Sequence, residues 1–576
     1  MGKVYLETTD SIWSINNNST TIYGTSALTD RVSISAGITG AIIDSTIERT
    51  DLSGDISNYK MKQGFGSNME VQDLNGNIIM TLASVSGKQL SFNNSVVDLA
   101  YIGGKVSVGG TVISSTATVI TPSTNNSLTN YSTMAAGKSA TNATLGSALS
   151  NVSTFGVSSL DSSYHWNTAS QSITYSFNAT IPASYAASTD GLTVNWTALN
   201  TAQEAAVTSI MQGLNSLIGT TVTPISSGGL IRFNIIDMGA GTAGFAYQPG
   251  PGTGDLTGDI FLSSGFNTIP ADFSLSVGGQ GWTTIAHELG HAMGLDHPAT
   301  GGVYGNQGKN STTLATAFDD TNHTIMSYTG KDNQILNFTL SGNSLSYKGS
   351  LIASDLYSLY DVETLQSIYG VNTTTNTQDN IYSVKYTDYK TQTIWDAGGT
   401  DTIDLSSALG SSTLDLNTST GGTINSADQY TFQQIVALQQ SLVNNAGFNT
   451  FIETSLQTLN TTGELYTGKN NLGIAQGVII ENVYTGSGAD TITDNEVDNI
   501  ISTYLGDDKI YLGQGGYDTV DGGGGNDTIF LNLLASQVNM EKQANGSYIL
   551  VADTFAVNFT GIETIQYSDN STLAIA

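Results

Sequence analysis

The chain has 576 residues, of which 48 are acidic and 17 are basic, so its formal net charge is -31. This negative charge disfavours nucleic acids and anionic membranes as partners and favours metal cations. The chain has no cysteine, which excludes disulfides and thiolate metal sites, so any transition-metal site must use His, carboxylate or Tyr ligands.

The length predicts several domains, and the abundance of Gly, Ser, Thr, Asn and Asp favours strands and turns over helices. The N-terminal stretch MGKVYLETTDSIWSINNNST lacks the basic region and apolar run of a Sec signal. No apolar run in the sequence is long enough to span a membrane. We therefore expect an extracellular-type protein that leaves the cell by a route other than Sec.

Residues 1–110 alternate short β-prone runs with turn signals such as the DLNG stretch at 73–76, which predicts a small all-β domain. Residues 111–150 are rich in Ser, Thr and Asn and are predicted to form a linker. We expect a second domain to begin at residue 151.

Residues 151–385 have the pattern of an α/β domain. Residues 201–219 place apolar side chains on one helical face, after a capping box predicted for Thr201 and Glu204. The strand-like runs LIRFNII and GDIFLSS follow, and residues 354–370 predict another helix that ends at Gly370.

Residues 386–576 contain a repeat. Its acidic position is spaced by 9, 9, 10 and 9 residues, with an apolar residue two positions later and glycines just upstream. The residues at that position are Asp490, Asn499, Asp508, Asp518 and Asp527. This spacing matches the nonapeptide of a calcium-binding β-roll.

The segment HELGHAMGLDHP at 287–298 holds three of the five histidines. In a helix, His287 and His291 lie one turn apart on one face with Glu288 beside them, and Gly294 lets the chain turn so that His297 approaches the same ion. Three neutral nitrogens with an open fourth position suit a catalytic zinc. The plain alternative is a helix whose histidines only satisfy core or surface hydrogen bonds, and the complete spacing disfavours it.

A second motif, TIMSY at 324–328, is similar to the Met-turn that lies beneath the zinc in metzincin proteases. Taken alone, Met326 would more often be an ordinary core residue. Its position after the histidine segment supports the metzincin interpretation.

With Pro298 after the third histidine, the chain resembles the serralysins, which are metzincin zinc metalloproteases of peptidase family M10 with RTX calcium-binding β-rolls. Further similar stretches are ITYSF at 173–177, LQSIYGVNTTTNTQDNIYSV at 365–384, IWDAGGTDTIDLS at 394–406 and GVIIENVYTGSGADTI at 477–492. The resemblance implies an α+β multidomain protein, in which a metzincin α/β protease domain is followed by a C-terminal parallel β-roll or β-sandwich. It also implies a secreted endopeptidase, exported by a type I secretion apparatus that reads a C-terminal signal.

The resemblance further implies roles for individual residues. His287, His291 and His297 would bind one Zn²⁺, and Glu288 would carry the proton of the attacking water to the leaving amine. Tyr328 would be an additional zinc ligand that swings away to stabilise the tetrahedral intermediate. Residues 258–264 are a candidate edge strand for an extended peptide substrate.

Several structural Ca²⁺ ions are the second cofactor that the resemblance implies. Aspartate carboxylates and glycine carbonyls supply the oxygen ligands that Ca²⁺ prefers. The candidate residues are Asp396, Gly398, Asp401, Gly486, Gly488, Asp490, Gly506, Asp508, Gly513, Gly515, Asp518, Gly523, Gly525 and Asp527.

The chain also departs from the family's pattern. About 150 residues precede the protease domain, residues 428–460 predict a helical insertion, and Asn499 replaces one repeat aspartate. We expect a monomer whose N-terminal domain binds a cell surface or acts as a pro-region. The rival interpretation is a surface-layer or adhesin-type structural protein with a protease-like domain; a calcium-dependent serine hydrolase lacks a recognisable nucleophile motif. His165 and His323 are interpreted as solvated loop residues.

Overall fold

The fold is mixed α/β, with mostly sheet structure and a C-terminal region of many strands. Contacts divide the chain into two compact units, Met1–Thr141 with Glu496–Ile501 and Ile510–Ala576, and Asn142–Asn495 with Ser502–Lys509. The computed structural model describes residues 2–5, 12–15, 17–24, 31–47, 49–85, 88–92, 95–102, 104–121, 159–167, 172–187, 192–239, 242–250, 254–264, 274–298 and 313–575.

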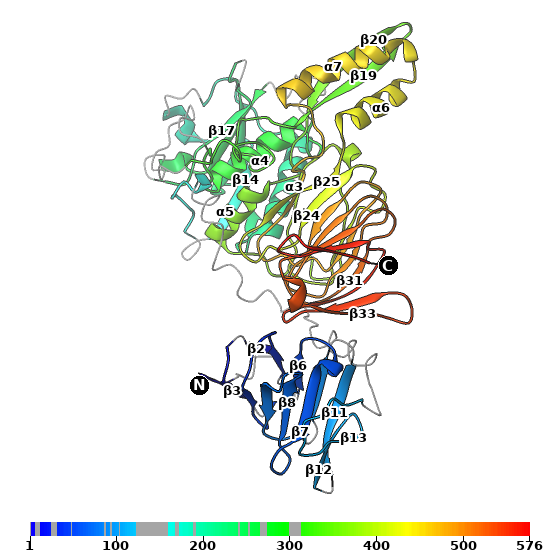
Figure 1. Cartoon of the computed structure of the whole chain (residues 1–576). Helices are drawn as coiled ribbons and strands as arrows, with labels where there is room; N and C mark the ends of the chain where they lie inside the picture. Colours follow the sequence, from blue (N-terminus) through cyan, green and yellow to red (C-terminus); the bar gives the residue numbers. More distant parts are fainter. Residues whose placement is uncertain are drawn as a thin grey trace. The chain divides into compact units, whose positions relative to one another are not determined.

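The N-terminal part of the first unit consists of two sheets, drawn in blue in Figure 1. One has the order β1-β3-β5-β9-β8-β7 and the other β13-β12-β11-β10-β6-β4-β2, so the first six strands alternate between the sheets, whereas β7–β9 share one sheet and β10–β13 share the other. The first neighbours in each sheet are parallel, so the chain winds as a two-layered coil before it ends in antiparallel strands. The strands are β1 (Gly2–Tyr5), β2 (Ile12–Ile15), β3 (Thr20–Tyr23), β4 (Arg31–Ile34), β5 (Ala41–Ile43), β6 (Arg49–Leu52), β7 (Tyr59–Gln63), β8 (Met69–Asp73), β9 (Ile78–Leu82), β10 (Lys88–Phe92), β11 (Ser95–Ile102), β12 (Lys105–Val108) and β13 (Thr111–Val112).

Inward-facing aliphatic side chains of both sheets form the core of this part. Ile22, Ile43 and Val32 are fully buried, and the same cluster includes Ile113 and Ile120. Packed β structure therefore continues past residue 110. Residues 122–150 of the linker predicted at 111–150 lie outside the described residues.

The second unit contains a five-stranded sheet of order β15-β14-β16-β18-β17, in which only β17 is antiparallel to its neighbour. Its helices α3 and α4 contact each other, and α4 also contacts β17 and β18 (Figure 1). The strands are β14 (Ile173–Phe177), β15 (Val222–Pro224), β16 (Ile231–Ile236), β17 (Gly244–Ala246) and β18 (Asp259–Ser263).

Helix α3 (Thr201–Leu217) confirms the helix predicted in this segment, but its cap differs. The N-cap is Asn200, whose side chain accepts hydrogen bonds from the amides of Ala202 and Gln203, while the Gln203 side chain accepts from the Asn200 amide. The predicted box of Thr201 and Glu204 is wrong by one residue. Asparagine is as good an N-cap as threonine, and the glutamine three residues on completes the box.

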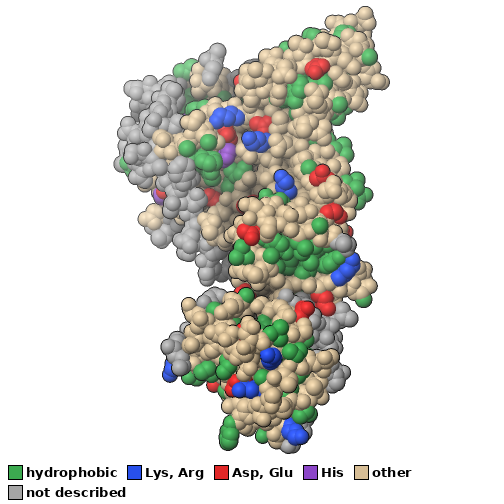
Figure 2. All heavy atoms as spheres, in the orientation of Figure 1, with side chains coloured by type: hydrophobic (Ala, Val, Ile, Leu, Met, Phe, Trp, Pro, Cys, Tyr) green, Lys and Arg blue, Asp and Glu red, His purple; other side chains and the backbone are tan. Residues whose placement is uncertain are grey.

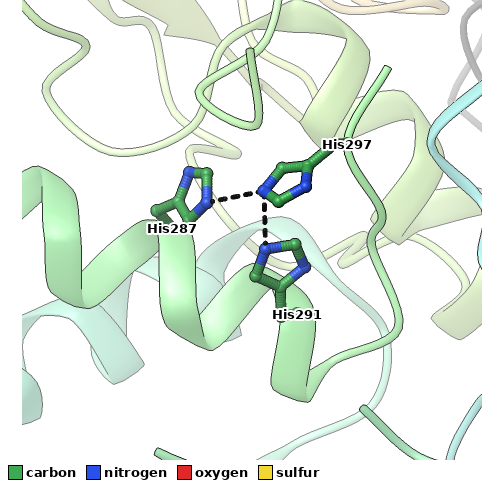
Figure 3. Close-up of side chains that lie close together, drawn as sticks. All are labelled: His287, His291 and His297. Atoms are coloured by element: carbon green, nitrogen blue, oxygen red, sulfur yellow. Dashed lines mark hydrogen bonds between the residues drawn. The ribbon is translucent and has the colours of Figure 1, made fainter. Parts of the chain in front are cut away.

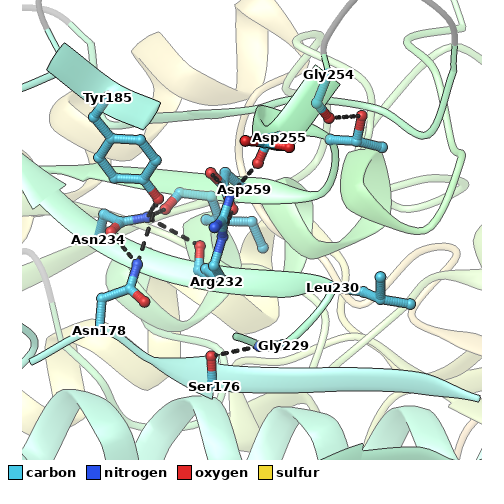
Figure 4. A network of polar contacts seen from close by, with 12 residues as sticks. Ser176, Asn178, Tyr185, Gly229, Leu230, Arg232, Asn234, Gly254, Asp255 and Asp259 are labelled. Atoms are coloured by element: carbon cyan, nitrogen blue, oxygen red, sulfur yellow. Dashed lines mark hydrogen bonds and ion pairs between the residues drawn. The ribbon is translucent and has the colours of Figure 1, made fainter. Parts of the chain in front are cut away.

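The other face of this sheet carries a buried polar network (Figure 4). Arg232 and Asp259 are direct neighbours on β16 and β18, and the guanidinium Nε lies 2.6 Å from the carboxylate. The Asn234 amide donates to the Tyr185 hydroxyl at 2.9 Å and accepts from the Trp196 indole at 3.2 Å. These bonds fasten Tyr185 and Trp196 to the sheet, because each buried polar group finds its partner there.

Two longer excursions follow the five-stranded sheet. Strands β19 (Gln334–Ser341) and β20 (Ser344–Leu351) form a hairpin that packs with α6 (Phe432–Val443) and α7 (Asn449–Thr462) (Figure 1). The two helices confirm the helical insertion predicted at 428–460. Helix α5 (Leu359–Tyr369) ends before Gly370, whose φ is +74°, as predicted.

The C-terminal region continues with parallel coils. In the second unit β22, β23 and β24 pair in parallel with β26, β27 and β28, and in the first unit β31 and β32 pair in parallel with β35 and β36. The apolar repeat positions are buried, as the repeat predicts. The strands are β21 (Ile381–Tyr382), β22 (Gln392–Ile394), β23 (Thr402–Asp404), β24 (Ser411–Asp415), β25 (Thr423–Gln429), β26 (Leu472–Ile474), β27 (Asn482–Tyr484), β28 (Thr491–Thr493), β29 (Ile500–Ser502), β30 (Lys509–Leu512), β31 (Tyr517–Asp521), β32 (Thr528–Leu531), β33 (Asn539–Lys542), β34 (Tyr548–Val551), β35 (Ala556–Thr560), β36 (Thr564–Gln566) and β37 (Thr572–Ala574).

The tan of the backbone and of the uncharged polar side chains makes up most of the described surface in Figure 2, and acidic and basic side chains are scattered over it. None of the helices in the described part of the chain has the length and apolar character required to cross a lipid bilayer.

Candidate metal centre

Helix α4 (Gln280–Ala292) carries the first two histidines of the motif on its buried side. After the helix, Gly294 has φ +99°, and a Cβ at this position would lie 2.7 Å from the carbonyl oxygen of Tyr164. Only glycine combines this backbone conformation with so close an approach. The turn brings His297 back over the helix toward His287 and His291 (Figure 3).

The three imidazoles converge through their Nε2 atoms. The Nε2 of His297 lies 3.3 Å from that of His287 and 3.1 Å from that of His291 (Figure 3). Two nitrogens bound tetrahedrally to zinc at their usual distance would be about 3.3 Å apart. Among the residues that the structure describes, this is the one set of three His, Cys, Asp or Glu side chains close enough to share an ion.

Backbone carbonyls fix the tautomers of two of these rings. Nδ1 of His287 donates to the Ile325 carbonyl at 2.8 Å, and Nδ1 of His291 donates to the Leu295 carbonyl at 2.9 Å. Burial, with a smaller contribution from a neighbouring histidine, lowers the pKa of both rings to about 3 and keeps them neutral. Both Nε2 lone pairs therefore face the centre, and this donor set fits a cation such as zinc.

Glu288 lies beside these ligands with 6% of its surface exposed. Its Oε2 atom is buried and makes no hydrogen bond within the described chain, and burial raises its pKa to about 8. Strand β17 passes close by: a Cβ added to Gly244 would lie 3.1 Å from Glu288 Oε1. A carboxylate in this state is suited to accept a proton near neutral pH.

Met326 and Tyr328 both lie near the metal ligands but differ in exposure. Met326 is fully buried, and its sulfur lies 2.9 Å from where a Cβ on Gly290 of α4 would be placed. The Tyr328 side chain is 76% exposed, and its ring centre is 4.6 Å from that of His297. Tyr328 is thus at the open side of the histidine cluster.

A segment that sequence reasoning missed holds the turn before His297. The amide of Ser162 donates to the Gly294 carbonyl at 3.0 Å, and the amide of Asp296 donates to the Leu160 carbonyl at 2.7 Å. The Trp166 indole donates to the Ala292 carbonyl at 2.8 Å at the end of α4. These contacts join residues more than a hundred positions apart, so local spacing gives no signal for them.

The prediction that residues 258–264 form an edge strand is wrong. Strand β18 pairs with β16 on one side and with β17 on the other, so it lies inside the sheet. The edge next to α4 is β17, which runs antiparallel to β18. The chain before β18 doubles back along it as β17, so both edges of β18 are paired.

Of the two remaining histidines, only one differs from expectation. His323 is 4% exposed, and its Nδ1 lies 2.6 Å from Oδ1 of Asp320, so the prediction of a solvated residue is wrong. Its ring packs against Tyr360 and Phe318. His165 is partly exposed and pairs with Asp161 at 2.6 Å.

The predicted calcium aspartates are all buried in the C-terminal coils. Oδ1 of Asp490 accepts from the Ser412 amide at 2.5 Å, and Oδ1 of Asp508 accepts from the Asp490 amide at 2.7 Å. Oδ1 of Asp518 likewise accepts from the Asn499 amide at 3.0 Å. Each of these three carboxylates thus accepts a hydrogen bond from an earlier coil of its own unit.

The second carboxylate oxygens of two predicted calcium aspartates indicate whether a cation fits here. Oδ2 of Asp401 and Oδ2 of Asp490 are buried without a hydrogen-bond partner within the described residues, and burial raises the pKa of each group to about 7. Buried anionic oxygens of this kind are stabilised by a cation. The glycines between them allow close coil stacking: a Cβ on Gly486 would lie 2.2 Å from the Ala408 carbonyl, and one on Gly488 2.3 Å from the Gly410 carbonyl. Six predicted glycines have positive φ, namely Gly398, Gly506, Gly513, Gly515, Gly523 and Gly525.

Comparison with known proteins agrees with this geometry. A family model described as metallo-peptidase family M12B, reprolysin-like, matches residues 170–359, which include all three histidines. Metallopeptidase AprA of Pseudomonas marginalis is 28% identical over 320 residues, covering 52% of this chain and 56% of that protein. Serralysin of Photorhabdus sp. (strain Az29) is 29% identical over 292 residues, covering 48% of each, and serralysin of Proteus mirabilis is 30% identical over 265 residues, covering 43% and 42%.

The chain thus spans about half the length of the curated relatives that it matches. The family model and the relatives both indicate a metallopeptidase, and the residues that the family model matches contain the converging histidines and Glu288. The comparisons therefore support a metallopeptidase domain in this chain that is similar to those of the serralysins.

Proposed function

We propose that the chain is a secreted, zinc-dependent endopeptidase that hydrolyses peptide bonds with a metal-activated water. The observation that supports this most is the convergence of three Nε2 atoms beside a buried carboxylate oxygen that has no other partner in the described chain. A histidine cluster that served only as core would have its ring nitrogens satisfied by protein groups.

The residues divide the chemistry between them. When bound by His287, His291 and His297, zinc would supply Lewis-acid activation of the water and of the scissile carbonyl. Glu288 would take a proton from the attacking water and deliver it to the leaving nitrogen, because its carboxylate is adjacent to the ligands and poorly solvated. Tyr328 would donate its hydroxyl to the developing oxyanion from the open side.

The edge strand of the five-stranded sheet indicates where an extended peptide substrate would bind. Strand β17 lies at this edge beside α4, and a peptide in extended form would add to it as a further strand. Main-chain hydrogen bonds of this kind do not depend on side-chain identity, which suits a protease acting on many proteins.

We further propose that several Ca²⁺ ions stabilise the C-terminal coils, which would form a β-roll. The supporting observation is the set of buried aspartates, of which Asp401 and Asp490 each keep one oxygen without a hydrogen-bond partner among the described residues. Asp396, Asp401, Asp490, Asp508, Asp518 and Asp527 would provide carboxylate ligands and the predicted glycines would provide carbonyls. A calcium-poor cytosol would then leave these coils unfolded and ready for export by a type I apparatus, and calcium outside the cell would fold them.

The proposed domains are an N-terminal β domain, expected at 1–110 but with core residues as far as Ile120, a linker in the remainder of 111–150, the protease domain at 151–385 and the calcium-binding region at 386–576. A purified full chain incubated with casein, with and without a zinc chelator, tests the activity, and Glu288→Ala is the matched variant. Cleavage by the zinc-loaded wild type alone supports the proposal. A folded, zinc-loaded protein that leaves casein intact would favour the surface-layer or adhesin-type alternative.

A further inference from the structure

One carboxylate at the start of α5 organises the segment beneath the metal ligands. Asp361 is fully buried. Its Oδ1 accepts from the Thr324 hydroxyl at 2.5 Å, and its Oδ2 accepts from the amides of Ile325 at 2.8 Å and Ser358 at 3.0 Å. Three donors from two separate parts of the chain therefore meet on a single side chain.

This arrangement continues to a metal ligand. The residue whose amide Asp361 binds, Ile325, offers its carbonyl to Nδ1 of His287 at 2.8 Å. Thr324, which is also fully buried, additionally accepts from the Met326 amide at 3.1 Å. Asp361 thus fixes the orientation of Ile325 through its backbone amide, and the carbonyl of Ile325 accepts the hydrogen bond from His287.

We propose that Asp361 is a positioning residue for His287, acting through Thr324 and Ile325 and without contacting the metal. This inference rests on the proposed zinc site and deepens it. An imidazole held by a hydrogen bond at Nδ1 keeps its Nε2 lone pair aimed at the ion, so loosening the carbonyl that receives the bond weakens metal binding. Asp361 does this from the helix that follows the ligands, 74 residues beyond His287.

Glu363 on the same helix provides a matched control. It is also a buried carboxylate, with 2% of its surface exposed, but its Oε1 accepts from the Gly422 amide at 2.7 Å. Among the described residues, it makes no hydrogen bond with the segment 324–326. Asp361→Leu and Glu363→Leu therefore make the same kind of change, and only the first breaks the path to His287.

Asp361→Asn serves as the conservative variant. Its single carbonyl oxygen can still accept from Ile325 and Ser358, and its amide can donate to the Thr324 oxygen, since a hydroxyl accepts as well as donates. Asp361→Asn is therefore expected to retain most of the zinc affinity. Asp361→Leu leaves all three donors without an acceptor.

The experiment measures the zinc dissociation constant of the full chain by competition with a chromophoric chelator, and the visible spectrum of the cobalt-substituted protein. Asp361→Leu should weaken zinc binding by about 10- to 100-fold relative to Glu363→Leu and change the cobalt spectrum. Equal affinities and spectra for these two variants would overturn the inference. If Asp361→Leu does not fold, Thr324→Val decides: weaker zinc binding supports the inference, and wild-type affinity overturns it. A wild type that binds no zinc in this titration would instead refute the proposed function.

Discussion

Replacing Gly294 with alanine tests how the turn delivers the third histidine. The glycine has φ +99°, and the new methyl group would lie 2.7 Å from the Tyr164 carbonyl and 3.1 Å from a ring carbon of His165. To relieve this contact, the segment 160–165 must move away from the turn. That movement breaks the bonds from Ser162 to Gly294 and from Asp296 to Leu160.

The expected loss of stability has two contributions. The backbone conformation costs a non-glycine residue about 1–3 kcal/mol. The two lost hydrogen bonds cost about 1 kcal/mol each. Gly278→Ala isolates the first contribution, because Gly278 has φ +74° and the nearest atom to its added Cβ, the Ala353 carbonyl oxygen, is 3.6 Å away. Gly294→Ala should therefore be less stable than Gly278→Ala by about 2 kcal/mol, which is roughly 4–8 °C in melting temperature.

Thermal unfolding of the metal-free proteins, followed by circular dichroism, measures this difference. Zinc content after dialysis, measured by mass spectrometry, should also be lower for Gly294→Ala, because His297 no longer returns over the helix. Gly278→Ala should keep its zinc. The same melting temperature and the same zinc content in both variants would show that the turn does not need glycine to place the ligand.

Four other perturbations follow from the site and the coils. Glu288→Ala should keep zinc but lose about 10²- to 10⁴-fold in kcat on a fluorogenic peptide; near wild-type turnover would remove Glu288 from the mechanism. Tyr328→Phe should lower kcat more than it raises KM, because its proposed bond strengthens as the oxyanion forms, and a change in KM alone would contradict this role. Burial raises the pKa of Glu363 from 4.5 to about 7, so the contribution of this side chain to stability is complete below pH 4.5 and is lost as the pH rises through 7. The melting temperature of Glu363→Gln minus that of the wild type should therefore grow between pH 4.5 and pH 7. A constant difference would refute the raised pKa of Glu363. Stripping all metals should lower the melting temperature of the C-terminal coils, and adding back calcium, but not zinc, should restore it. Each calcium site should add about 2.7 kcal/mol to the free energy of unfolding at a hundredfold excess over Kd. Restoration by zinc alone would argue against calcium.

Local patterns allowed the metal ligands to be predicted from the sequence. His287, Glu288 and His291 belong to one helix, so their spacing alone determines that they share a face. Gly294 could be placed because its distance from that helix is fixed in the motif, and Met326 could be placed because it belongs to a second recognisable motif, TIMSY, further along the chain. The helix α3 was predictable from its apolar face, whereas its N-cap was shifted because Asn200 and Thr201 are both suitable caps.

Non-local pairing explains what could not be predicted. The edge position belongs to β17 and not to β18, and only the order of the strands reveals this. Asp361 acts on a segment more than thirty residues earlier, and no spacing rule connects them. His323 was misjudged for another reason: Asp320 lies only three residues away, and this local pair could have been noticed as a sign of burial.

The segment 160–166 sets a limit on how far the N-terminal side of the chain can be removed. A protease that cut within the expected linker at 111–150, including a second copy of this enzyme, would leave Leu160, Ser162 and Trp166 attached to the metallopeptidase domain. A cut after Trp166 would remove the partners of Gly294, Ala292 and Asp296 and leave the third histidine unsupported. Maturation of the protein and its inactivation would thus differ by the position of a single cleavage, and the N-terminus of the smallest active form should fall no later than Ser159.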